Sequence, residues 1–137
     1  MLPREQRLTA RRDFKRVYAR GRAFVNRLLV LRVLGKNGGQ AARFGFSTSS
    51  KLGNAVLRNR MTRLLRESIR SLAGKIRETG FDAVVIVRPG ARSATLVQIR
   101  EAVEDLLRKA KLLEAPLLGR ELNSRPNNGA KQDQARD

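Results

Sequence analysis

Cysteine and histidine are both missing from this chain of 137 residues. The lack of cysteine excludes disulfides, and the lack of both residues excludes zinc sites of the Cys/His type. Mechanisms in which an imidazole activates a nucleophile are excluded as well. Tryptophan is also absent and only 4% of the residues are aromatic, although 41% are hydrophobic. The chain therefore has enough apolar residues to fold, but it lacks those on which many catalytic sites depend.

Long apolar runs are lacking too. No uninterrupted stretch approaches the roughly 18 to 20 residues of a membrane span. The start of the sequence, MLPREQRL, has no apolar core of the kind found in a signal peptide. We therefore expect a soluble, cytoplasmic protein with no membrane partner. The length indicates one domain, which we place at residues 1–113, and the composition of residues 114–137 predicts a disordered tail.

Acidic residues are scarce. The sequence has 12 Asp and Glu against 30 Lys and Arg, which gives a formal net charge of +18. Residues 1–70 carry a net charge of +15, and residues 71–137 carry +3. A basic protein with no particular partner is one interpretation of this composition. The uneven distribution favours another, a surface that binds a polyanion such as nucleic acid.

A first helix is predicted by the segment LTARRDFKRVYARGR. Thr9 can cap its start, and Gly21 stands where a left-handed residue would end it. Phe14 and Tyr18 are one helical turn apart and share one face. Their rings either pack into the core or border a groove in which a nucleobase could stack.

Three strands are predicted, at about residues 24–34, 43–48 and 81–89. A short turn with three glycines separates the first two, so we expect them to pair as an antiparallel hairpin. The third strand is apolar at nearly every position and should be covered on both faces. A final amphipathic helix follows over residues 94–113, with a capping-box pattern at Thr95 and Gln98.

The segment GNAVLRNRMTRLLRES starts another helix, and its two faces differ. On a helical wheel one face is apolar and consists of Leu57, Met61, Leu64, Leu65, Ser68, Leu72 and Ile76. The opposite face contains Asn59, Arg63, Arg66 and Arg70, with Arg60 beside it and Arg58 at the edge of the apolar stripe. Arginine forks suit phosphate oxygens, and Asn59 can donate and accept hydrogen bonds.

This face has an unusual composition. Surface helices usually mix acidic with basic residues. Here Glu67 is the one acid among five arginines, so the like charges repel each other unless a partner supplies counterions. A merely solvated face is the alternative, but the pattern favours polyanion binding.

The elements therefore follow the order helix, two strands, helix, strand, helix, with room for one further strand. This order predicts an α+β fold, a small α/β sandwich in which three helices cover a mixed sheet of about four strands.

The segment RFGFSTSSKLGNAVLRNRMTRLLRES resembles the protein subunit of bacterial ribonuclease P. That family has the pattern R-x-G-x-S-x-S-K-K-x-G-x-A-V-x-R-N-R-x-K-R-x-x-R-E. The matching positions are Arg43, Gly45, Ser47, Ser49, Lys51, Gly53, Ala55, Val56, Arg58, Asn59, Arg60, Arg63, Arg66 and Glu67. RLTARRDFKRVYARG, NRLLVL and DAVVIVRP are similar to the family as well, so the resemblance covers about residues 4–113. Ser50 and Thr62 depart from it, because each stands where the family usually has lysine.

The resemblance implies a ribonucleoprotein that removes the 5′ leader from precursor tRNA. A large RNA subunit would carry the catalysis with its own Mg²⁺, and the protein would have no catalytic or metal site. The implied contacts to that RNA are Lys51, Arg58, Asn59, Arg60, Arg63, Arg66 and Arg70. The single-stranded leader would lie in a cleft between the first helix and the sheet, bordered by Phe14, Tyr18, Val30 and Arg32. Arg32 stands where some members have an aromatic residue. The family also has a rare left-handed crossover around the R-N-R helix, which general topology rules disfavour.

Two other functions stay open. A ribosomal or other general RNA-binding protein would share the basic helix and the sheet, but it would not discriminate for precursors that carry a leader. A self-sufficient endonuclease would need acidic metal ligands. The candidates, Asp13, Glu67 and Asp82, are scattered among different elements. No small-molecule substrate is indicated.

Overall fold

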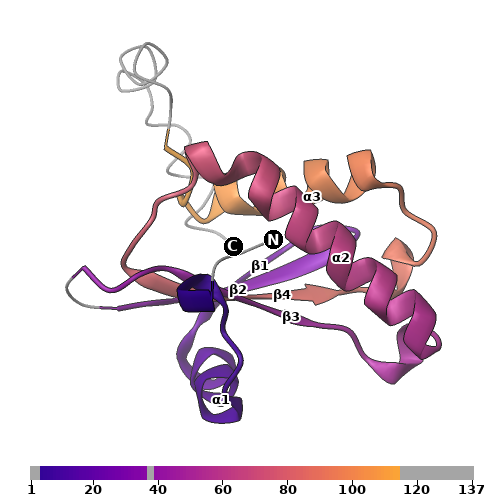
Figure 1. Ribbon diagram of the computed structural model, residues 1–137, viewed down its shortest axis with the longest axis horizontal. Coiled ribbons are helices and arrows are strands. Elements are labelled where there is room, and N and C mark those ends of the chain that lie inside the picture. Colours follow the sequence, from indigo (N-terminus) through magenta and orange to yellow (C-terminus); the bar gives the residue numbers. More distant parts are fainter. Residues whose placement is uncertain (1–3, 37–38, 115–137) are drawn as a thin grey trace.

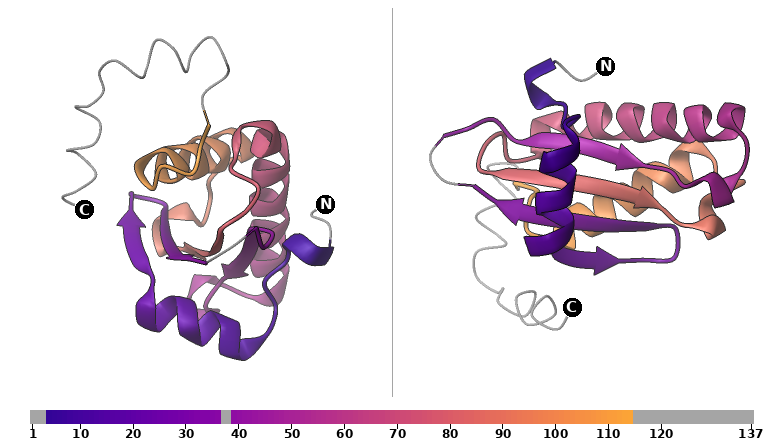
Figure 2. Two further views of the ribbon diagram at one scale, coloured as in Figure 1. Left: turned by 90° about the vertical axis from the view of Figure 1, so that its left-hand side faces the viewer. Right: turned by 90° about the horizontal axis from the view of Figure 1, so that it is seen from below.

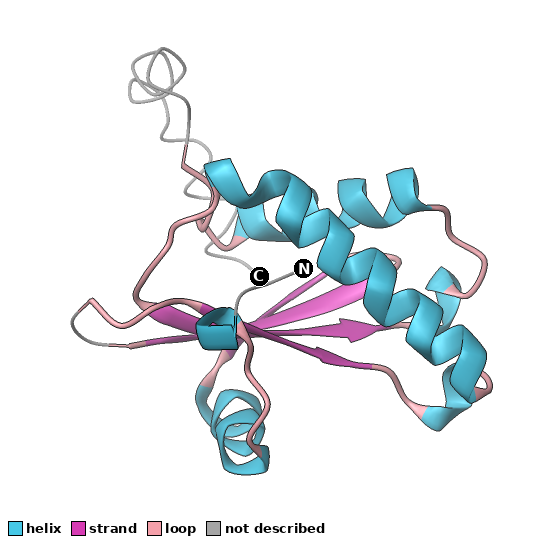
Figure 3. Ribbon diagram, in the orientation of Figure 1, coloured by secondary structure: helices cyan, strands magenta, loops and turns pink. Residues whose placement is uncertain are grey.

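A computed structural model describes residues 4–36 and 39–114 of the chain. Within these ranges the helices are α1 (Arg11–Arg20), α2 (Ala55–Leu72) and α3 (Leu96–Lys109). The strands are β1 (Arg22–Val25), β2 (Leu29–Gly35), β3 (Arg43–Ser47) and β4 (Phe81–Val87). The predicted α+β class, with three helices on a four-stranded mixed sheet, is confirmed (Figure 3). None of the helices in the described ranges is long and apolar enough to cross a membrane.

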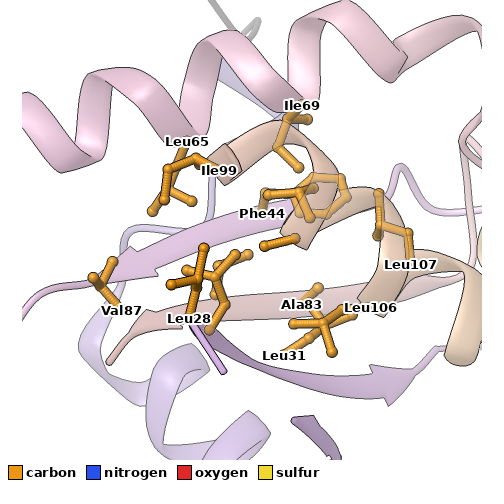
Figure 4. Packing of buried hydrophobic residues seen from close by; sticks show 14 of the residues in the cluster. Leu28, Leu31, Phe44, Leu65, Ile69, Ala83, Val87, Ile99, Leu106 and Leu107 are labelled. Atoms are coloured by element: carbon orange, nitrogen blue, oxygen red, sulfur yellow. The ribbon is translucent and has the colours of Figure 1, made fainter. Parts of the chain in front are cut away.

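The sheet lies between two helical layers (Figure 1). On one face α2 and α3 enclose the larger core, in which Ile69 of α2 lies next to Phe44 of the sheet (Figure 4). On the other face α1 covers a smaller core around Val17 and Val84. Both faces of β4 are therefore covered, as its continuous apolar run predicted.

The predicted hairpin between residues 24–34 and 43–48 is wrong. The strand order is β1-β2-β4-β3, so β4 lies between these two segments. β4 pairs antiparallel with β2 and parallel with β3, and α2 makes the crossover from β3 to β4. The glycine-containing turn is only a local signal, whereas the central position of a sheet goes to a strand that can bury both faces. This arrangement leaves β3 and β1 at the two edges.

The predicted first strand is in fact two strands, which are joined by a tight turn at Asn26. Its Oδ1 accepts hydrogen bonds from the backbone N–H groups of Leu28 (3.1 Å) and Leu29 (2.9 Å). Its Nδ2 donates to the carbonyl of Ala102 and to Asp105 on α3, both at 3.0 Å. Asparagine favours turns because its side chain can bond the backbone two residues further on. The turn folds β1 back beside β2 and so supplies the fourth strand.

The predicted ends of α1 are also wrong. Ala10 rather than Thr9 precedes the helix, and no side chain caps it. Gly21 is extended (φ −77°, ψ 162°) and not left-handed. Glycine is needed there for space, because a Cβ would lie 2.5 Å from the carbonyl oxygen of Val17 and 3.0 Å from that of Val33. The end of α1 can therefore approach β2 closely.

The predicted capping box at the start of α3 is confirmed. Thr95 Oγ1 accepts from the backbone N–H of Gln98 (3.2 Å), and Gln98 Oε1 accepts from that of Thr95 (2.9 Å). The predicted apolar stripe of this helix faces the core, with Ile99, Val103 and Leu106 all buried. Of the predicted disordered tail, residues 115–137 lie outside the described residues.

Candidate nucleic-acid interface

The R-N-R helix, α2, is positioned by its start and by its apolar face. Asn54 Oδ1 accepts a hydrogen bond from the backbone N–H of Leu57 (3.0 Å) and so caps the helix. Lys51 lies just before it in a 3-10 turn and is exposed. Met61 and Leu65 point into the core and are 0% exposed. The side of α2 opposite these residues is therefore presented to solvent.

That outer side has the predicted row of residues one helical turn apart, which we call the basic face: Asn59, Arg63, Arg66 and Arg70. Asn59, Arg63 and Arg70 are exposed, and Arg66 is half-buried. Arg70 forms an exposed ion pair with Glu67 (2.9 Å), a kind of pair that contributes little to stability. Arg63 and Arg66 have no ion-pair or hydrogen-bond partner for their guanidinium groups within the described residues. Both groups are thus available to an anion.

The two arginines of the R-N-R sequence have different surroundings. Arg60 lies beside the basic face, and its Nη2 donates to the carbonyl of Ala94 (3.3 Å) in the loop before α3. Arg58 is half-buried, and its Nε is buried without a hydrogen-bond partner among the described residues. A buried donor without a partner costs free energy. Arg60 is therefore partly used within the fold, whereas the Nε of Arg58 has no acceptor among the described residues.

The four residues implied in leader binding lie together on the sheet face that α1 covers. The ring centroids of Phe14 and Tyr18 are 6.4 Å apart. Val30, Arg32 and Leu34 are every second residue of β2 and so point to the same face, where Leu34 packs against the small core under α1. Phe14 also packs against this core, whereas Tyr18 is 38% exposed. The sequence allowed these rings either to pack into the core or to border a groove. Phe14 packs partly into the core, whereas Tyr18 is exposed and open to a ligand.

Arg32 also fastens the C-terminal end of α1 to the sheet. Its Nη2 donates to the carbonyl oxygens of Tyr18 (2.8 Å) and Gly21 (2.9 Å). The last carbonyl groups of a helix lack partners within it and attract a cation. Contact between Arg32 and a leader stays a prediction, but the structure shows that this side chain positions α1.

A network of charged side chains holds the other end of α1. Arg43 on β3 donates to Asp82 on β4 through Nε (2.9 Å) and Nη2 (2.8 Å), and its Nη1 lies 3.3 Å from Asp13 on α1. Lys36 Nζ lies 2.8 Å from Asp82 Oδ1. Asp82 is only 1% exposed. The helix that carries Phe14 and Tyr18 is therefore held against the sheet at both ends.

The sequence did not predict this network. Asp13 and Asp82 look like isolated acids in the chain, yet they share one arginine in the structure. The sequence did contain a sign that Asp82 needs a partner, because it is the one charged residue in the apolar run FDAVVIV. The described part of the chain contains no group of three or more acidic residues that could hold a metal ion. In the structure Asp13 and Asp82 are each ion-pair partners of Arg43.

The network should make stability depend on pH. Burial raises the pKa of Asp82, but the hydrogen bonds and charges of Arg43 and Lys36 outweigh it and hold the pKa below its ordinary value of 3.8. A carboxylate with a lowered pKa contributes stability that is complete above its unfolded pKa and is lost as the pH falls through its folded pKa. We therefore expect the free energy of unfolding to decrease below about pH 4.

Denaturant unfolding of the wild type and of Asp82→Asn, from neutral pH to about pH 2, measures this effect. The asparagine variant cannot titrate at this position, so the difference in free energy between the two proteins should shrink as the pH falls. A difference that stays constant over this range would contradict the prediction.

The sequence of the chain is similar to those of known proteins of one family. The family model for ribonuclease P matches residues 2–111. The ribonuclease P protein component of Shouchella clausii is 42% identical over 118 residues, which are 86% of this chain and 95% of that protein. The one from Symbiobacterium thermophilum is 43% identical over 108 residues, 79% of this chain and 93% of that protein.

The fold of the chain is similar to solved structures of proteins from the same family. The RNase P protein of Staphylococcus aureus has a TM-score of 0.71 and 35% identity, covering 80% of this chain and 98% of that one. The RNase P protein of Thermotoga maritima has a TM-score of 0.68 and 31% identity, covering 75% of this chain and 96% of that one. The family match, the relatives and the shared fold lead to one conclusion: this chain belongs to the ribonuclease P protein family.

Proposed function

We propose that the chain serves as the protein component of a bacterial ribonuclease P in the cytoplasm. In this role it binds the catalytic RNA of that enzyme and the single-stranded 5′ leader of precursor tRNA, and so assists endonucleolytic removal of the leader. The observation that supports this function is the division of the molecule into two binding faces. α2, the helix with the basic face, lies on one side of the sheet, and α1, the helix with Phe14 and Tyr18, lies on the other (Figure 1). Two RNAs can thus be bound at once.

The basic face suits a folded RNA. From Asn59 to Arg70 it extends over about 16 Å at the rise of an α-helix, which is long enough to follow several phosphates. The guanidinium groups of Arg63 and Arg66 have no partner within the described residues and can bind phosphate oxygens in a bidentate manner. Each phosphate that is neutralised releases counterions and adds affinity that depends on salt.

The α1 face suits a single strand. Bases that are not paired expose their flat faces, and each base stacked on an aromatic ring contributes about 1–3 kcal/mol. Tyr18 is exposed, and Phe14 lies one turn away on the same side of the helix. Arg11, which is three residues before Phe14, and Lys15, three residues before Tyr18, are exposed and add positive charge for the backbone of the strand. The face therefore combines stacking with charge.

We further infer that the RNA subunit carries out the catalysis and holds the Mg²⁺ that it requires. The chain has no histidine or cysteine, and the two acids that are buried in the described part of it, Asp13 and Asp82, are bound to Arg43. The protein would contribute binding energy: it neutralises phosphates where two RNAs meet and lowers the concentration of Mg²⁺ needed for cleavage.

Cleavage of a precursor tRNA at low Mg²⁺ tests this function. The reaction is run with a bacterial ribonuclease P RNA alone, with this protein alone, and with both. We expect release of the intact leader only when both are present. A protein that binds the RNA tightly without promoting cleavage would instead be a general RNA-binding protein. Cleavage by the protein alone would overturn both functions.

A further inference from the structure

A small pocket of 90 Å³ opens beside the C-terminal end of α2, on the face of the sheet that α2 and α3 cover. The N-terminal segment crosses the β3 edge of the sheet next to α2 (Figure 2), where the N–H of Leu8 donates to the carbonyl of Phe44 (2.9 Å). The pocket lies on the Gln6 side of this crossing, and α1 contributes none of the described residues that line it. It is therefore separate from the face that carries Phe14 and Tyr18.

The pocket has an apolar floor and a polar rim. Phe44, Ile69 and Ile76 form the floor, and each is at most 5% exposed. The rim has Gln6, which is half-buried, and Arg77 and Glu78, which are exposed. Pockets for drug-sized ligands begin at about 300 Å³. This one suits a smaller, flat group such as a single nucleobase.

The rim offers a hydrogen-bond donor and an acceptor next to each other. The Arg77 guanidinium group lies over the Phe81 ring, 5.9 Å from its centroid. A Cβ at position 80 would lie 3.2 Å from its Nη2, so Gly80 leaves room for this group. The carboxylate of Glu78 has no hydrogen bond or ion pair with any described residue. A positioned cation and an available carboxylate therefore meet at one opening.

These groups match a nucleobase better than a phosphate. The carboxylate of Glu78 repels a phosphate, and the apolar floor offers it no hydrogen bond. A base can place one flat side on the floor and its edges at the rim. Guanine is the base that presents two adjacent N–H donors, at N1 and N2, to a carboxylate. Its O6 and N7 are the acceptors that arginine most often binds.

The pocket lies where the basic face ends. Arg66, Arg70 and Ala73 follow one another at helical spacing along α2 and the 3-10 turn after it, so they share one side. Ala73 lines the pocket. An RNA whose phosphates follow the arginines of the basic face therefore reaches the pocket just beyond the last of them.

We propose that this pocket binds one unpaired guanine of the RNA subunit. The base lies on the apolar floor, Glu78 accepts from its N1–H and N2–H, and Arg77 donates to its O6 or N7. The proposal rests on the function proposed above and deepens it, because it adds recognition of one base to the phosphate contacts of the basic face.

Kethoxal footprinting of a bacterial ribonuclease P RNA tests the proposal, because this reagent reacts with N1 and N2 of unpaired guanines. At saturating concentrations, the wild-type protein should protect one guanine that Glu78→Gln leaves reactive, with all other protections unchanged. The amide of the variant presents an N–H where guanine also presents one. We therefore expect Glu78→Gln to weaken binding of the RNA about tenfold.

The direction of this change separates a site from a general effect of charge. Removing an acid from a basic protein should by itself tighten its binding to RNA. Glu101→Gln is the matched control, because Glu101 is exposed on α3 and its carboxylate has no partner within the described ranges. It should not weaken binding, and it should keep every protection.

A second pair of variants tests the space in the pocket without changing the charge. Ala73→Leu fills the pocket and should also leave the guanine reactive. Ser71→Leu adds the same side chain at an exposed position two residues earlier, on a different side of the helix. It should keep the protection.

The other outcomes overturn the proposal. Glu78→Gln with tighter binding and all protections retained would show that only total charge matters. If Ala73→Leu keeps the protection, the guanine does not lie in the pocket. If precursor tRNA is added and the only guanine sensitive to Glu78→Gln belongs to it, the pocket does not serve the RNA subunit. A wild-type protein that promotes cleavage without protecting such a guanine refutes the pocket alone, whereas failure to promote cleavage refutes the proposed function itself.

Discussion

Replacing Asp82 with alanine should lower the free energy of unfolding by about 3–5 kcal/mol. The Asp82 side chain is 1% exposed, and it binds both Arg43 and Lys36, whose side chains are 28% and 14% exposed. Loss of one partner of a buried ion pair is costly because the remaining charges lie in a medium of low dielectric constant. Arg43 would retain only Asp13, at 3.3 Å, and Lys36 would lose its one ion-pair partner in the described part of the chain. Urea unfolding at neutral pH measures the change.

Glu67→Ala is the matched control for this variant, because it also removes one carboxylate from an ion pair. The side chains of Glu67 and Arg70 are 45% and 55% exposed, and exposed pairs contribute only about 0–1 kcal/mol. If Asp82→Ala costs no more than Glu67→Ala, the network does not hold α1, β3 and β4 together. Asp82→Asn keeps the size of the side chain and should cost less than the alanine variant, because it can still accept one hydrogen bond.

Elements with a strong local signal could be predicted from the sequence. The apolar residues of α2 and α3 recur at helical spacing over several turns, and this spacing places them on one face whatever the rest of the chain does. The capping box of α3 involves residues three positions apart. The continuous apolar run of β4 required cover on both faces, and α1 on one side and the other two helices on the opposite side provide it.

Features that depend on distant residues could not be predicted. The order of the strands is set by which strand can bury both faces, and β4 inserts between two strands that a short turn connects. Asn26 broke the predicted first strand because its side chain, besides closing a local turn, donates hydrogen bonds to α3, 76 and 79 residues away. Gly21 was predicted to end α1 in a left-handed conformation, but its role is to let α1 pass close to β2. The strand order, the contacts of Asn26 with α3 and the approach of Gly21 to β2 have no signal within a short window of sequence.

The same distinction holds for the candidate site. The basic face followed from periodicity alone, because residues one turn apart on a helix share a side. The structural roles of Arg32 and Arg43 did not, since Arg32 bonds residues 14 and 11 positions away and Arg43 bonds Asp82, 39 positions away. In the sequence these arginines look like further charges for RNA. In the structure they fix the helix that bears the Phe14 and Tyr18 rings.

Replacing Arg60 and Arg63 together with alanine should weaken binding of the RNA subunit by about 10- to 100-fold at moderate salt, since hydrogen bonds to charged groups are worth about 1.5–3 kcal/mol before screening. The slope of log K against log salt should become shallower by about two units, one for each lost phosphate contact. Arg63 is exposed and unpaired within the described residues, so its removal should leave the fold intact. Arg60 also donates to the carbonyl of Ala94, so its removal could lower stability as well as RNA affinity. The single variant Arg63→Ala separates the two effects, because it leaves this hydrogen bond in place.

The matched control removes the same charge from another helix. Arg100→Ala with Arg108→Ala takes two arginines from α3, where both are exposed and Arg108 is paired with Glu104. Long-range attraction of RNA by the net charge of the protein falls equally in the two double variants. Only contacts made by individual side chains can therefore separate them. A shallower slope for the α2 variant and a nearly unchanged slope for the α3 variant assigns the phosphate contacts to α2. Equal slopes would mean that the RNA responds to total charge, and that the basic face of α2 does not bind it.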